Sequence, residues 1–188
     1  MWNSLLTNAR SLPLFDWKVL LPGIDIGQFR AKYLNPAPGE ALRLLCPDAA
    51  DCPEECHYRK VRELSSGLMA CCPLDITRPR IPVTPEDIGI FRLNYARVHK
   101  EIADALGIEF SSVDLDDAFF WELGCLKTGT GSRMPVYISY YLNIMEFEHR
   151  LENLLREDQP FILLVGCLAD VPKAMLAALR QKKCVCLG

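Results

Sequence analysis

The chain has 188 residues, half of them apolar, and a formal net charge of −3. This length suits one domain, or a small module joined to a larger one, with a substantial core. The slightly negative charge provides no overall attraction to nucleic acid or to an anionic membrane. The longest apolar run, Phe161 to Leu168, has the length of a core strand and not of a membrane span.

The first residues do not follow the pattern of a signal peptide. No basic segment precedes Leu5-Leu6, and Asn8, Arg10 and Asp16 interrupt the apolar stretch. We therefore expect a cytoplasmic protein, in which thiols stay reduced. The nine cysteines are then expected to be metal ligands and buried thiols, and their odd number also argues against a complete set of disulfides.

Up to about Gly39 the apolar spacing predicts helices that are interrupted at Pro13 and at Pro22-Gly23. A helix is expected over residues 26–34, where apolar side chains recur at helical spacing. The Pro-rich segment 35–39 should end it. These elements indicate packing and suggest no chemistry.

The segment from Cys46 to Cys72 contains five cysteines and carries most of the functional information. Residues 41–45 are expected to form a short strand, and residues 58–64 and 68–72 a β-hairpin around Ser65-Ser66-Gly67. The hairpin would bring its second strand back toward Cys56 if the loop after Cys46 folds over. The spacing, C-x5-C-x3-C-x15-C, departs from the paired C-x2-C knuckles of a standard zinc ribbon.

Thiolates at this density are typical zinc ligands. Neighbouring residues of a strand point to opposite faces, so at most one of Cys71 and Cys72 is expected to be a ligand. We prefer Cys72, because a proline follows it as one follows Cys46 and Cys52. The prediction is one structural zinc, with Cys71 or His57 as a substitute ligand, held by Cys46, Cys52, Cys56 and Cys72. Free buried thiols, disulfides, and an iron–sulfur cluster or redox thiols stay open as alternatives.

A stiff, Pro-rich connector follows over residues 78–85, and we expect the domain boundary there. Residues 1–80 would form a helical N-terminal segment plus a Cys-rich hairpin module, and residues 81–188 a small α/β domain. Thr84 as N-cap, Pro85 in the first turn and Asp87 in a capping-box position predict the start of a helix.

An apolar stripe from Ile88 to Leu106 extends this helix to Gly107, through Phe91, Tyr95, Val98 and Ile102. We expect the stripe to pack on the sheet that contains residues 161–165. His99 lies beside the stripe and is expected to be a boundary residue with its hydrogen bonds satisfied.

The rest of the chain alternates strand and helix patterns. They predict a hairpin of residues 119–123 and 135–142, helices over 144–157 and 173–182, and strands over 161–165 and 184–187. The final strand–helix–strand order favours a parallel pair. The fold class is therefore α+β or mixed α/β, a Cys-rich hairpin module followed by a small mixed sheet flanked by helices. The abrupt ending suggests a chain truncated from a longer protein.

Four further features are candidate functional sites. Residues 127–133 are Gly-rich and basic but lack the order of a phosphate-binding loop, and residues 166–170 fit a turn between strand and helix. An acidic group could serve a metal-dependent hydrolase or nuclease, and it comprises Asp114, Asp116, Asp117 and Glu122. A basic set flanks the cysteine hairpin, offset by nearby acids, and it comprises Arg59, Lys60, Arg62, Arg78 and Arg80.

The order of these features resembles that of an uncharacterised bacterial Cys-rich family of unknown function. The matching segments begin after about Ala41, and they are Cys46-Pro47 with Cys52 and Cys56, the hairpin with Gly67 and Cys72, Thr84 to Asp87, Phe120 to Gly124, and Pro160 to Leu164. The resemblance implies no activity and no catalytic residues. It implies that such segments precede other domains in longer chains.

We therefore expect a non-catalytic, zinc-stabilised interaction or regulatory module of a bacterial protein rather than an enzyme. A nucleic-acid-binding regulator is the first alternative, and a metal-dependent hydrolase or nuclease is the second. The expected partner is another protein chain or a further domain of the same protein, with a homo-oligomer or nucleic acid as further options and no membrane.

Overall fold

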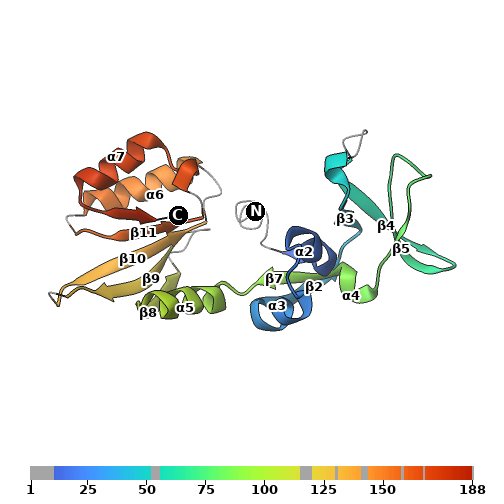
Figure 1. Cartoon of the computed structure of the whole chain (residues 1–188), viewed down its shortest axis with the longest axis horizontal. Helices are drawn as coiled ribbons and strands as arrows, with labels where there is room; N and C mark the ends of the chain where they lie inside the picture. Colours follow the sequence, from blue (N-terminus) through green and yellow to red (C-terminus); the bar gives the residue numbers. More distant parts are fainter. Residues whose placement is uncertain are drawn as a thin grey trace. The chain divides into compact units, whose positions relative to one another are not determined.

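The computed structural model describes residues 11–51, 56–114, 120–129, 131–140, 144–157, 159–166 and 168–187. These residues form two compact units: an N-terminal unit that ends at Asn94 and a C-terminal unit that begins at Tyr95 (Figure 1). The described residues contain six α-helices and three sheets, which are antiparallel or mixed. The protein thus has the α+β fold expected from its sequence.

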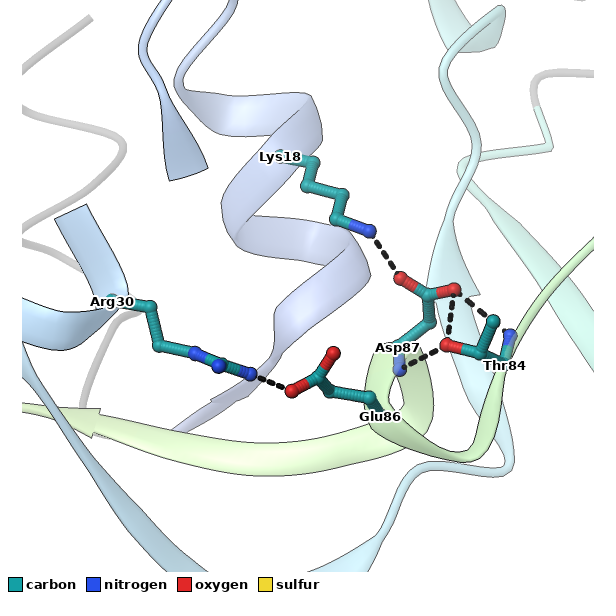
Figure 2. A network of polar contacts seen from close by, with 5 residues as sticks. All are labelled: Lys18, Arg30, Thr84, Glu86 and Asp87. Carbon is teal, nitrogen blue, oxygen red and sulfur yellow. Dashed lines mark hydrogen bonds and ion pairs between the residues drawn. The ribbon is translucent and has the colours of Figure 1, made fainter. Parts of the chain in front are cut away.

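Three short helices belong to the N-terminal unit, and they are α2 (Leu14–Leu20), α3 (Ile26–Tyr33) and α4 (Pro85–Ile88). Asp25 caps α3 by accepting hydrogen bonds from two backbone amides of its first turn. The capping box predicted for Thr84 and Asp87 is confirmed. Figure 2 shows that α4 also connects the other two helices, because Asp87 pairs with Lys18 of α2 and Glu86 pairs with Arg30 of α3.

The long helix predicted for residues 85–106 is wrong. The chain leaves α4 at Gly89 and continues as β7 (Gly89–Leu93) before α5 (Tyr95–Leu106) begins. β7 is the central strand of an antiparallel three-stranded sheet, between β1 (Leu12–Pro13) and β2 (Leu34–Glu40). Pairing on both sides overrides the helical spacing of its apolar residues. The Pro-rich segment expected to end the preceding helix lies in β2, an edge strand, where proline is tolerated.

The cysteine region forms the second sheet of the N-terminal unit. Its strands are antiparallel, in the order β3-β4-β5-β6, and they are β3 (Arg43–Leu45), β4 (Tyr58–Leu64), β5 (Gly67–Cys71) and β6 (Ile81–Pro82). The hairpin predicted around Gly67 is confirmed, and the positive φ of 107° at this residue suits glycine. One face of the sheet packs into a core with Leu44, Ala70, Val83 and Ile88.

The domain boundary expected after residue 80 falls inside the N-terminal unit. β6 pairs with β5 of the cysteine hairpin, and α4 contacts α2. Residues 81–94 therefore belong with the cysteine region, and the chain passes from the N-terminal to the C-terminal unit between Asn94 and Tyr95.

The C-terminal unit is built on a mixed sheet with the order β12-β11-β10-β9-β8. Its strands are β8 (Glu109–Asp114), β9 (Phe120–Lys127), β10 (Arg133–Ser139), β11 (Ile162–Val165) and β12 (Val185–Leu187). β9 and β10 form the predicted hairpin, and β11 and β12 form the predicted parallel pair. The sequence did not predict β8.

Helices cover this sheet, as Figure 1 shows for α6 (Ile144–Arg156) and α7 (Lys173–Gln181). Both helices were predicted, and they contribute Phe147, Leu151 and Leu179 to a core with Tyr137 and Leu163. α5 packs over β8 and β9. It thus lies on the predicted sheet, but Val98 and Ile102 are only half-buried there.

A glycine fixes the close approach of β8 and β9. Gly124 has a φ of 137°, and a Cβ atom added there would lie 2.0 Å from the carbonyl oxygen of Glu109. The ladders on both sides of β9 shift register near this residue. No other residue type fits this irregularity without displacing the backbone.

Candidate metal centre

The strand order brings three of the predicted ligands to the same end of the β3-β4-β5-β6 sheet. Cys46 directly follows β3, Cys72 directly follows β5, and Cys56 lies just before β4, which runs in the opposite direction. The backbone amide of Cys46 donates to the carbonyl of His57, which extends the β3–β4 ladder by one step. All three cysteines are buried.

Cys56 and Cys72 are in contact and form a small buried cluster of their own. The Cys56 thiol donates to the carbonyl oxygen of Tyr58 at 2.9 Å. The Cys72 sulfur accepts hydrogen bonds from the backbone N–H groups of Leu74 and Asp75, and the Asp75 nitrogen lies 3.4 Å from it. These bonds lower the pKa of the Cys72 thiol. Amide donors that converge on a sulfur favour its thiolate form, which is the form that binds metal.

Arg59 lies beside Cys46 and is itself almost fully buried, with 1% of its surface exposed. Its guanidinium donates to the carbonyl of Pro79 at 2.7 Å and to the carboxylate of Asp48 at 2.9 Å. Burial alone would lower the pKa of Arg59, but its contacts with Cys46 and Asp48 raise it. Its Nε atom is buried and has no hydrogen-bond partner within the described part of the chain.

The other predicted ligands are placed differently. Cys52 lies outside the described residues. Cys71 is half-buried, and its thiol lies 3.9 Å from the carbonyl oxygen of Met69, while the His57 side chain is exposed. Among the residues that the structure describes, no three His, Cys, Asp or Glu side chains come together as a metal-binding group. The structure therefore places Cys56 in contact with Cys72 and places Cys46 at the same end of the sheet.

The acidic group lies in the C-terminal unit. Asp114 is opposite Trp121 in the β8–β9 ladder, and Glu122 is opposite Val113. Asp116 and Asp117 lie outside the described residues. In the Gly-rich loop, Lys127 and Arg133 both pair with Glu109, so one carboxylate offsets part of their charge.

His99 is the buried polar group that sequence reasoning placed wrongly. It is 1% exposed, and its ring lies 5.0 Å from that of Trp121 and 5.6 Å from that of Tyr140. Burial lowers its pKa to about 4, and Nε2 has no hydrogen-bond partner among the described residues. A helix that begins at Tyr95 places His99 and Ala103 on its inner face, whereas the longer predicted helix placed the stripe on Val98 and Ile102.

In the parts of the chain that the structure describes, no helix is both long and apolar enough to cross a membrane. Comparisons with protein-family models, with curated proteins and with solved structures found no match.

Proposed function

We propose that the chain is a non-catalytic interaction or regulatory module of a bacterial protein, stabilised by one zinc ion held by Cys46, Cys52, Cys56 and Cys72. The observation that carries this proposal is the buried contact between Cys56 and Cys72, at the sheet end where Cys46 also lies. Thiolates are the preferred ligands of structural zinc, and four of them complete its tetrahedral coordination.

The charges around the cysteines support a metal–thiolate group. Four thiolates and one Zn²⁺ carry a net charge of −2, which is costly to bury without compensation. The buried Arg59 guanidinium beside Cys46 supplies positive charge, which it shares with the Asp48 carboxylate. The amides that donate to the Cys72 sulfur supply further compensation of the kind that supports metal ligands.

Such a zinc ion would act on structure and not on a substrate. It would connect the ends of β3 and β5 to the segment before β4, in addition to the backbone hydrogen bond between Cys46 and His57. A closed four-thiolate site offers no open coordination position for a substrate or a reactive water molecule. The expected activity is therefore association.

The loop after Cys72 supports association with another protein chain or a further domain. Leu74 and Ile76 are 61% and 89% exposed. The loop between them is ordered, because the Asp75 carboxylate accepts from the backbone N–H of Thr77 at 2.8 Å and pairs with Arg78. These two apolar side chains are available for contact with another chain or domain. A homo-oligomer and a cytoplasmic location belong to the same proposal.

The test is elemental analysis of protein purified without added metal. We expect one zinc per chain, retained in Cys71→Ser and in the control Cys125→Ser from the C-terminal unit, and lost in Cys72→Ser. Size-exclusion chromatography of the same samples reports self-association. A metal-free wild-type protein, iron in place of zinc, or equal retention by Cys71→Ser and Cys72→Ser would contradict the proposed site.

A further inference from the structure

The outer face of the β3-β4-β5-β6 sheet presents a row of basic side chains. Residues alternate between the two faces of a strand, and the inner face at this level carries Leu44, paired with Arg59. On the outer face Arg43 pairs with Lys60, and Lys60 in turn pairs with Cys71 of β5. Arg80 directly precedes β6, where the register places it next to Cys71.

We define the basic row as four exposed residues, namely Arg43, Lys60, Arg62 and Arg80. Arg62 lies on the same face, two residues further along β4. Within the described ranges none of the four forms an ion pair. The other two members of the basic set are engaged elsewhere, since Arg59 is buried with Asp48 and Arg78 pairs with Asp75.

This row is not expected from sheet stability. Like charges directly opposite each other on neighbouring strands, as Arg43 and Lys60 are, destabilise a sheet. The N-terminal unit has as many acidic as basic residues between Ala9 and Asn94, eleven of each, so a general basic excess does not explain the row. The segregation of the cations on one face is a local feature that an anionic ligand would compensate.

The spacing of the row fits a linear polyanion. Four strands about 4.8 Å apart spread the row over about 14 Å, and Arg62 lies about 7 Å along β4 from Lys60. A nucleic-acid strand in a duplex carries one phosphate per about 3.4 Å of helix axis, so the row covers an axial length of roughly four phosphate steps. The Arg43 guanidinium lies over the Tyr58 ring, 4.8 Å from its centroid, and adds a flat cationic surface on which a base can stack.

We propose that the basic row binds the phosphate backbone of a nucleic-acid strand. This inference goes beyond the proposed zinc site and does not depend on it, because strand register fixes the row on the face opposite Arg59. The interaction is expected to be weak and electrostatic, since the chain as a whole carries a net charge of −3.

The experiment measures fluorescence anisotropy of labelled oligo(dT) and oligo(U) of about 20 nucleotides at about 50 mM salt, followed by a salt titration. The test variant is Arg43→Gln/Lys60→Gln/Arg62→Gln. The matched control removes three exposed charges from the C-terminal unit, in and just after α7, by Lys173→Gln/Arg180→Gln/Lys183→Gln. A duplex of the same length distinguishes single-stranded from double-stranded ligands.

We expect the test variant to bind the oligonucleotide about tenfold or more weakly than wild type. Its slope of log affinity against log salt should be shallower by roughly 2, because three phosphate contacts are lost. The control should match wild type. The single substitution Arg62→Glu, with circular dichroism on each variant, keeps the test valid if the triple variant does not fold. Absence of salt-sensitive binding, equal losses in test and control variants, or binding only to anionic vesicles would overturn the proposal.

Discussion

Protonation of His99 should destabilise the C-terminal unit in mild acid. The imidazole is buried against aromatic rings, those of Trp121, Tyr140 and Tyr95. Burial lowers its pKa to about 4, from 6.5 for an exposed histidine. The folded unit therefore prefers the neutral ring. The stability that this preference provides is fully present above pH 6.5 and is lost as the pH falls toward 4.

The magnitude follows from the two pKa values. The pKa of His99 is 6.5 in the unfolded chain and about 4 in the folded unit. This difference lowers the free energy of unfolding by about 2 kcal/mol between about pH 7.5 and pH 5, and by about 3 kcal/mol in stronger acid. The loss should appear in α5 and its neighbours β8 and β9, because the protonated ring has to leave their interface.

Hydrogen–deuterium exchange with mass spectrometry can follow α5 separately from the N-terminal unit. We expect the free energy of opening measured for residues 95–106, corrected for intrinsic exchange, to fall by about 2 kcal/mol over this pH range. His99→Phe and His99→Leu should remove most of this pH dependence whatever they do to absolute stability. The exposed His149 provides the control, His149→Gln, which should behave as wild type. A wild-type α5 insensitive to pH, or the same dependence in both His99 variants, would refute the reasoning.

Two further predictions concern other buried positions. Burial raises the pKa of Asp16 to about 6, although its carboxylate accepts a hydrogen bond from the Leu45 amide at 2.8 Å. The free energy of unfolding of the N-terminal unit should therefore rise by about 1 kcal/mol as the pH falls from about 7.5 to 5. Asp16→Asn should abolish that gain in exchange measurements on α2, and an unchanged gain would contradict it. Gly124→Ala should cost about 3 kcal/mol, because the new Cβ meets the Glu109 carbonyl at 2.0 Å. Urea denaturation measures this cost, with Gly129→Ala as a control that has open space, and equal midpoints would exclude the strain.

Elements with strong local signals were predictable from the sequence. The hairpin around Gly67 has a glycine where φ is positive, and the start of α4 has a complete capping box. Both depend on residues only a few positions apart. β7 was missed because its apolar residues continue the helical spacing of α5, and only its pairing with β1 and β2 makes it a strand.

The sequence suggested which cysteines could form the candidate site, but it did not indicate the buried charge beside them. The spacing of Cys46, Cys56 and Cys72 indicated that strands bring them together, and the strand ends do meet. Arg59 was grouped with the other cations that flank the cysteine hairpin, because closeness in sequence does not show which face of a strand a residue occupies. Val61 could have shown that Arg59 faces the core. It pairs with the buried Ala70, so the odd-numbered residues of β4 lie on the inner face of the sheet.

β4 therefore contributes residues to both proposed sites, to the zinc site from its inner face and to the basic row from its outer face. Arg59 points to the cysteine end of the core, whereas Lys60 and Arg62 carry the basic row on the outer face. Because alternate residues of a strand are on opposite faces, a substitution on one face leaves the other face's side chains in place. The test variant Arg43→Gln/Lys60→Gln/Arg62→Gln should keep its zinc. Cys72→Ser should keep its salt-dependent oligonucleotide binding as long as the β3–β4–β5 ladder persists. Loss of both properties in both variants would mean that metal and nucleic acid share one site, and the division of β4 into two functional faces would then be wrong.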